Sequence, residues 1–199
     1  MGIAPCMHAG QGCANPTRLL LPRSRYDEGV EILRGIYEGV AAGDPQDPGT
    51  LCGPVISERQ RDRVQSYLDL AIEEGGRFAC GGGRSADHDK GFFIEPTVIA
   101  GLTNDARVAR EEIFGPVLSI VRVQSYEEGV ALINAGAFGN GTAIFTRDGD
   151  AAREFAHQVE VGPRREDQLH VLADQDGWNG EVMARLSTAR YGAVDRSEE

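Results

Sequence analysis

One cysteine, Cys13, stands in a glycine-rich stretch, "HAGQGCANPTR", whose residue types suit covalent chemistry. A catalytic thiol must be presented to its substrate, needs small neighbours so that a carbonyl group can approach, and needs nearby N–H groups to hold an oxyanion. Gly10, Gly12 and Ala14 supply the clearance, and a turn leading into a strand or helix supplies aligned N–H donors. The alternative is a glycine-rich connection with an incidental thiol, because a single cysteine motif has low specificity.

A second stretch with chemical potential is "AREEIFGPVLSI", residues 109–120. Glu111 and Glu112 precede Phe114, and a Gly-Pro turn then directs the chain into an apolar strand. A carboxylate fixed at such a turn can accept hydrogen bonds from both hydroxyls of a sugar, and the aromatic ring can shelter a flat ring. The alternative is a solvated pair of acids beside a phenylalanine of the core.

Composition narrows the classes of protein that the chain can represent. Its 199 residues are enough for one domain, or for one domain with an irregular extension, and 41% hydrophobic with 26% charged residues is typical of a globular protein. A formal net charge of -11 argues against nucleic-acid partners and anionic membranes, because like charges repel. No stretch reads as a membrane span, and residues 1–13 lack the features of an export signal. We therefore expect a cytoplasmic protein.

The four cysteines are Cys6, Cys13, Cys52 and Cys80, and no two of them form a CxxC pair. The histidines do not stand at the spacings of metal ligands, so we expect no metal site. Without an export signal, the default is four reduced thiols, and most such cysteines are buried small hydrophobes. Only the context of Cys13 favours chemistry.

Apolar runs and amphipathic stretches alternate along the chain. The patterns predict strands at 17–22, 77–82, 117–123 and 141–147, and a strand pair or an extended segment bent at Pro96 in 92–101. They predict helices at 24–43, 57–74, 125–134 and 150–159. In the strand "VLSIVRV", Ser119 and Arg122 mark the side expected to be exposed. This alternation predicts an α/β fold with a mostly parallel sheet and helices on both faces.

Local signals define several helix ends. Ser24 with Asp27, Ser57 with Gln60, and Ser125 with Glu128 read as capping pairs, and Gly43 as the stop of the first helix. After Gly162 the periodicity weakens and the chain ends in a charged stretch, so we expect an irregular or disordered tail at 163–199 without a final strand.

Five stretches in order carry a resemblance to the aldehyde dehydrogenase superfamily: "AGQGC", "GDPQDPGTLCGPVIS", "KGFFIEPTV", "AREEIFGPVLSIVRV" and "FGNGTAIFTRD". The resemblance covers about 8–162 and corresponds to the catalytic domain, which forms the C-terminal half of a full-length enzyme. It implies a partial catalytic domain at 1–162, followed by a divergent tail at 163–199.

The resemblance also implies a mechanism. Cys13 matches the nucleophile that attacks a small aldehyde to give a thiohemiacetal, and hydride transfer to NAD or NADP then gives a thioester. Glu112 matches the carboxylate that holds the hydroxyls of the nicotinamide ribose, and Phe114 matches the aromatic residue beside the nicotinamide ring. The likeness of residues 133–162 to methylmalonate-semialdehyde dehydrogenases favours coenzyme A as acyl acceptor, whereas "GQGCANPTRLLLP" favours water, so both remain open.

Two departures from the family pattern limit what is expected of the chain. In the family, the dinucleotide-binding domain, the glutamate base and the oxyanion-holding asparagine precede the cysteine, where this sequence has residues 1–12. After Gly162, "PRREDQLH" replaces an apolar strand, and the subunit-pairing arm of the homo-oligomeric family is not recognisable. We therefore expect an aldehyde dehydrogenase-type oxidoreductase that is inactive alone. The alternative is a non-catalytic remnant or module that associates with a related oligomer.

Overall fold

The computed structural model describes residues 2–138, 141–160 and 169–173. The described strands are β1 (Pro16–Pro22), β2 (Arg77–Cys80), β3 (Thr97–Leu102), β4 (Val117–Val123), β5 (Gly141–Phe145) and β6 (Leu169–Ala173). The described α-helices are α1 (Tyr26–Glu38), α2 (Glu58–Glu73), α3 (Arg107–Arg110), α4 (Tyr126–Asn134) and α5 (Gly149–Gln158), with 3-10 helices η1 (Ala4–Gly10) and η2 (Arg23–Arg25).

These strands form one sheet in the order β2-β3-β4-β1-β6-β5. Strand β1 pairs in parallel with β4, from Arg18 opposite Ser119 to Pro22 opposite Val123. The pairs β3 with β4, β1 with β6 and β5 with β6 are also parallel, and among the described strands only β2 runs antiparallel, against β3. The predicted mostly parallel sheet is therefore confirmed.

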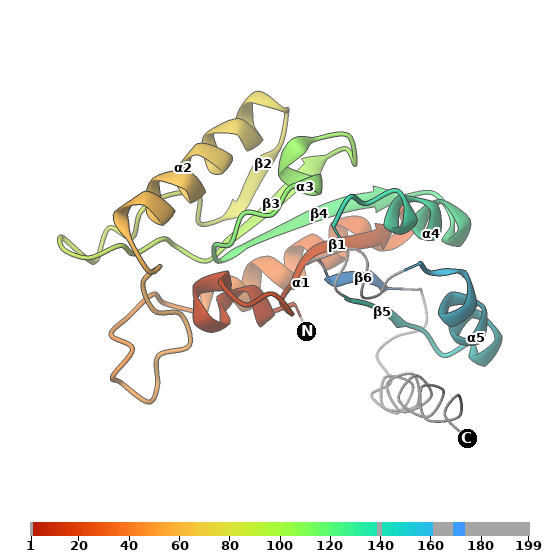
Figure 1. Ribbon diagram of the computed structural model, residues 1–199, viewed down its shortest axis with the longest axis horizontal. Coiled ribbons are helices and arrows are strands. Elements are labelled where there is room, and N and C mark those ends of the chain that lie inside the picture. Colours follow the sequence, from red (N-terminus) through yellow and green to blue (C-terminus); the bar gives the residue numbers. More distant parts are fainter. Residues whose placement is uncertain (1, 139–140, 161–168, 174–199) are drawn as a thin grey trace, which may run out of the picture.

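Helices cover both faces of the sheet, and alternating strand residues explain why. Helix α1 packs with Leu118 and Ile120 of β4 in one hydrophobic cluster, and it passes behind the strands in Figure 1. Helices α2, α4 and α5 contribute to a second cluster that contains Val117 and Val121 of the same strand. Successive side chains of a strand point to opposite faces, so one apolar strand serves both clusters.

The first helix differs from the sequence prediction at both ends. A 3-10 turn at η2 precedes it, its N-cap is Arg25, and no side chain caps it there, so the predicted Ser24 and Asp27 capping pair is wrong. Helix α1 ends at Glu38 with Gly39 as its C-cap, before the predicted stop at Gly43. The 3-10 turn moves the N-cap by one residue, from Ser24 to Arg25, which explains the error, because capping requires a fixed spacing from the first helical N–H groups.

The other two predicted serine caps are present. Ser57 Oγ accepts from Gln60 N at 3.2 Å, and Ser125 Oγ accepts from Glu128 N at 3.2 Å. The side chain of Gln60, however, reaches away from the helix start, as described below. The prediction that Ser119 marks an exposed side is wrong: Ser119 is buried, and its hydroxyl donates to Val108 O at 3.3 Å. That hydrogen bond allows a polar side chain to lie in the core.

The expected absence of a strand after Gly162 is also wrong. Residues Leu169–Ala173 form β6, which fills the position between β1 and β5 through parallel backbone pairing on both sides. The remainder of the predicted tail lies outside the described residues. Among the described residues, none of the helices combines the length and apolar character that crossing a membrane requires.

Candidate functional site

Cys13 lies in a tight turn between η1 and β1. The turn is closed by a hydrogen bond from Asn15 N to Gly12 O at 3.0 Å, and Cys13 at its tip is exposed. Asn15 Nδ2 donates to Met7 O at 3.3 Å, and Gln11 Oε1 accepts from Ile56 N at 3.0 Å. The turn is therefore braced on both sides by side chains from its own glycine-rich stretch.

Gly10 joins this turn directly to the segment before β4. Its φ of +71° lies in the left-handed region, and a Cβ added there would overlap the carbonyl oxygen of Gly115. Only glycine satisfies both conditions without strain. The two stretches singled out by their chemistry, far apart in sequence, are thus in backbone contact.

Helix α2 holds the second stretch from the other side. Gln60 Nε2 donates to Ile113 O at 3.0 Å and to Phe114 O at 2.8 Å. Arg63 Nη2 donates to Glu112 O at 2.6 Å. The backbone of Phe114 is itself left-handed, with a φ of 55°. Three consecutive carbonyl groups therefore accept hydrogen bonds from side chains of α2.

These contacts bring the three sequence-predicted site residues together. Cys13, Glu112 and Phe114 line one cleft of about 20 Å³, which they share with Gly10, Gly12, Asn15, Thr17 and Ile113. So small a cleft cannot enclose a ligand by itself. It presents a thiol, a carboxylate and an aromatic ring at one place.

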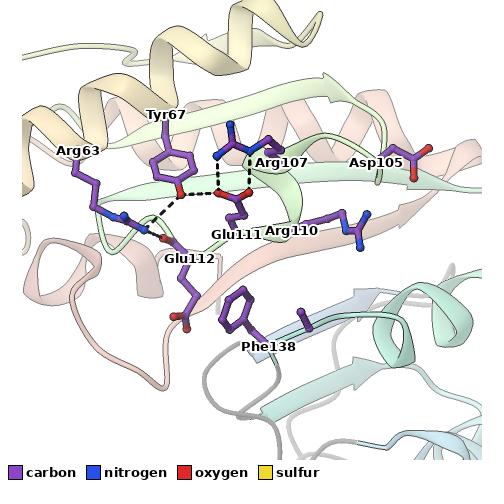
Figure 2. Close-up of a pocket in the computed structure, with 9 residues that line it drawn as sticks. Arg63, Tyr67, Asp105, Arg107, Arg110, Glu111, Glu112 and Phe138 are labelled. Atoms are coloured by element: carbon purple, nitrogen blue, oxygen red, sulfur yellow. Dashed lines mark hydrogen bonds and ion pairs between the residues drawn. The ribbon is translucent and has the colours of Figure 1, made fainter.

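A larger pocket of about 460 Å³ adjoins this cleft, because Glu112 lines both. Figure 2 shows Glu112 with its carboxylate directed away from Tyr67, toward the side of the pocket where Phe138 lies. Behind it, Tyr67 Oη donates to Glu111 Oε2 at 2.7 Å, and Arg107 Nε donates to Glu111 Oε1 at 2.8 Å. The two adjacent acids thus differ: Glu111 belongs to a structural network, and Glu112 faces the cleft.

The Glu111 network has clear electrostatic consequences. Hydrogen bonds from Arg107 and then from Tyr67 lower the pKa of the Glu111 carboxyl below its ordinary value of 4.5. The pKa of Tyr67 is raised, first by burial and then by its hydrogen bond to Glu111. Both shifts favour an ionised Glu111 that accepts from a neutral Tyr67.

Arg18, at the start of β1, is a buried charge close to the site. Its Nη1 donates to Asn104 Oδ1 at 2.9 Å and its Nη2 donates to Leu132 O at 3.4 Å. Burial, and then the nearby charge of Arg110, lower the pKa of Arg18 to about 10. Arg18 therefore ties the strand that follows the Cys13 turn to the loop before α3 and to α4.

The remaining cysteines have different surroundings. Cys6 and Cys52 are fully buried, and burial is the first cause that raises their pKa values, to about 12 and about 11. Cys80 is partly buried, and burial also raises its pKa. Within the described part of the chain, no group of three or more His, Cys, Asp or Glu side chains is placed to hold a metal ion.

Sequence reasoning missed four residues that shape the site: Arg18, Gln60, Arg63 and Tyr67. Gln60 carries a signal in the sequence, but its spacing from Ser57 indicates a capping pair and not a contact with Ile113 and Phe114. Arg18 stands among apolar residues in a predicted strand, which is itself a sign of a buried and bonded charge. Arg63 and Tyr67 are ordinary helix residues by pattern, and nothing in the sequence links them to Glu111 or Glu112.

Comparisons with known proteins agree on one family. The family model described as "Aldehyde dehydrogenase family" matches residues 3–165. Geranial dehydrogenase of Castellaniella defragrans is 42% identical over 160 residues, which are 80% of this chain and 33% of that protein. Betaine aldehyde dehydrogenase of Brucella ovis is 40% identical over 155 residues, 77% of this chain and 32% of that protein. The chain thus spans about a third of the length of these curated relatives.

Solved structures give the same result. An aldehyde dehydrogenase of Mycobacterium tuberculosis in complex with NAD+ superposes with a TM-score of 0.78 and 41% identity, covering 86% of this chain and 34% of that one. A mutant of aldehyde dehydrogenase C from Pseudomonas syringae, in complex with NAD+ and octanal, has a TM-score of 0.78 and 34% identity. This match covers 89% of this chain and 36% of that one. Family match, relatives and fold coincide, and the chain belongs to the aldehyde dehydrogenase family.

Proposed function

We propose that this chain carries the nucleophile side of an aldehyde-oxidising site, in which the thiolate of Cys13 attacks the carbonyl carbon of a small aldehyde. The observation that carries the proposal is the single cleft lined by Cys13, Glu112 and Phe114. Attack forms a C–S bond and converts the carbonyl oxygen to the oxygen of a thiohemiacetal. Loss of hydride from that carbon gives a thioester on Cys13, which water or a second thiol such as coenzyme A resolves.

The cleft has features that fit a nicotinamide cofactor. Glu112 lines both the cleft and the larger pocket, where its carboxylate would accept hydrogen bonds from a ribose, and Phe114 would offer an aromatic surface in the same cleft as Cys13. NAD or NADP, when bound, accepts the hydride that leaves the thiohemiacetal. The bound NAD+ in solved relatives supports this assignment.

The polypeptide assayed by itself is expected to show weak cofactor affinity and no turnover. None of the residues 1–12 before Cys13 is a carboxylate, whereas the family resemblance places the glutamate base before the nucleophile. A thioester without a base to activate water resolves slowly. Steady NADH production from propanal by the purified polypeptide at ordinary enzyme concentrations would contradict this expectation.

Protection of Cys13 by an aldehyde tests the proposed chemistry directly. The alkylation rate of each cysteine with iodoacetamide is measured by mass spectrometry of peptides, with and without millimolar propanal. We expect propanal to slow alkylation of Cys13, because thiohemiacetal formation consumes the thiol, and to leave Cys80 unaffected. Propan-1-ol is the matched control. Equal slowing of Cys13 and Cys80, or no slowing at all, contradicts the assignment.

A non-catalytic module that associates with a related oligomer is the second candidate. It is favoured by the sheet edges, since among the described strands β2 and β5 each pair on one side only. Such edges can accept a further strand. Size-exclusion chromatography of the chain mixed with a full-length relative tests this candidate, and two unshifted peaks would remove it.

A further inference from the structure

Helix α2 presents two side chains to three consecutive carbonyl groups of the segment Glu112–Phe114. Gln60 uses its side-chain nitrogen twice, for Ile113 O and Phe114 O, while Arg63 donates to Glu112 O. An amide nitrogen has two hydrogens, so both donors of Gln60 are committed to this segment. Gln60 therefore does more than begin a helix.

The segment needs such support because its own backbone is irregular. It leaves α3 after Arg110 and enters β4 at Val117, and Phe114 between them has a left-handed φ of 55°. A left-handed backbone at a residue with a Cβ is strained and persists only when its surroundings fix it. Val64, four residues after Gln60 on α2, closes the contact, since a Cβ on Gly115 would lie 2.6 Å from Val64 Cγ2.

We propose that Gln60 is a positioning residue for Phe114 and Glu112. By directing the carbonyl groups of Ile113 and Phe114 toward α2, its amide leaves the side chains of Phe114 and Glu112 on the opposite side, where both line the cleft with Cys13. The role in catalysis rests on the function proposed above. The geometric effect of Gln60 on the wall of the cleft is independent of that function.

The experiment measures how the cleft wall selects between reagents of different size. Cys13 is alkylated with iodoacetamide and with N-phenyl iodoacetamide, and the ratio of the two rates is compared among variants of the 199-residue chain that melt cooperatively. In Gln60→Ala we expect the ratio to change at least threefold in favour of the bulkier reagent, because a released Phe114 no longer restricts the approach. The ratio at Cys80 stays constant.

The matched control is Gln65→Ala on the same helix, where the amide donates to Asp69 Oδ1 at 3.0 Å on the exposed side. It should keep the wild-type ratio. Gln60→Glu keeps the length of the side chain and its packing but removes both donors, so it should change the ratio as Gln60→Ala does. Wild-type ratios in both Gln60 variants overturn the proposal.

A double variant separates positioning from general loosening of the fold. Phe114→Ala removes the wall itself, and adding Gln60→Ala to it should then have no further effect on the ratio. A Gln60 effect that persists unchanged without the Phe114 ring overturns the assignment. Failure of propanal to protect Cys13 would remove the proposed function and leave this result intact, so the two failures are distinguishable.

Discussion

Cys6 and Cys13 both precede β1 in the sequence, but their sulfur atoms meet different surroundings. Cys6 lies in the core, and its pKa is raised to about 12, first by burial and then by Cys52, while a hydrogen bond with Tyr37 acts in the opposite direction. Cys13 lies exposed at the tip of a turn, in a cleft that it shares with Glu112 and Phe114.

The difference lies in the flanking residues and in what they pack against. The stretch before Cys6 enters the core beside Tyr37 and Cys52, so its thiol behaves as a small apolar group. Cys13 itself lies in an exposed turn, and Gly10 fixes that turn against Gly115 instead. The reactivity of each thiol therefore depends on whether it lies in the core, as Cys6 does, or in an exposed turn, as Cys13 does.

The largest expected effect is on thiol reactivity. At about pH 8, the fraction of thiolate in a thiol with a pKa of about 12 is roughly 10⁻⁴. Burial slows alkylation further, because it keeps the reagent away from the sulfur. We expect iodoacetamide to label Cys13 at least about a thousandfold faster than Cys6 in the folded chain. Labelling in denaturing urea, followed by mass spectrometry, is the control and should nearly equalise the rates. Similar rates in the folded chain would mean that the two environments are not distinct.

Gly10→Ala should destabilise the turn that holds Cys13 without changing the thiol itself. The added methyl group would overlap Gly115 O, and the left-handed backbone adds strain. We expect a loss of about 3 kcal/mol or more in the free energy of unfolding, measured by chemical denaturation. Gly35→Ala is the matched control, since no atom lies within 4 Å of a Cβ there and α1 should gain slightly from alanine. Equal stabilities of the two variants contradict the proposed contact.

Arg18→Met tests the buried charge behind the Cys13 turn. It leaves Asn104 Oδ1 and Leu132 O without their donor, which should cost about 2 kcal/mol of stability. Arg122→Met, on the neighbouring strand, removes an exposed guanidinium that lies 4.3 Å from the ring centroid of Tyr26, and should cost at most about 1 kcal/mol. A smaller loss for Arg18 than for Arg122 would refute the anchoring role of Arg18.

Glu111→Gln should have the smallest effect on stability, and the size of that effect should depend on pH. Because Arg107 and Tyr67 lower the pKa of Glu111 below 4.5, the ion pair stabilises the fold above that pH and its contribution is lost as the pH falls through the lowered value. The pair is partly exposed, so we expect less than about 1 kcal/mol at neutral pH, and a difference that disappears as the pH falls through the lowered pKa of Glu111. Melting temperatures across this range check it. Glu73→Gln, an exposed carboxylate at the end of α2, should show no such trend.

Much of the fold was predictable because apolar periodicity is local information. Strands such as Val117–Val123 and serine caps such as Ser57 follow from residue types at short spacing. The start of α1 could not be predicted in this way, because the 3-10 turn before it leaves no distinct pattern in the sequence. Strand β6 could not be predicted from the sequence either, since its pairing depends on open edges of β1 and β5 that are visible only in three dimensions.

The candidate site divides in the same way. Small neighbours singled out the Cys13 stretch and a Gly-Pro turn singled out the Glu111–Phe114 stretch, and the family resemblance then selected Glu112 rather than Glu111. Gln60 and Arg63 were not singled out, since their partners are backbone carbonyl groups 53 and 49 residues away. A carbonyl group carries no sequence signature, so contacts to it are found only when the fold is known.

The backbone contact between Gly10 and Gly115 has a consequence for transplanting this site. No side chain lies between the two stretches to absorb a change, so a residue inserted in either one displaces the other. A scaffold that is to receive the thiol turn must therefore also receive the segment before β4 and the face of α2 that holds it. The transferable unit is this three-part assembly, although its members are scattered over more than a hundred positions of the chain.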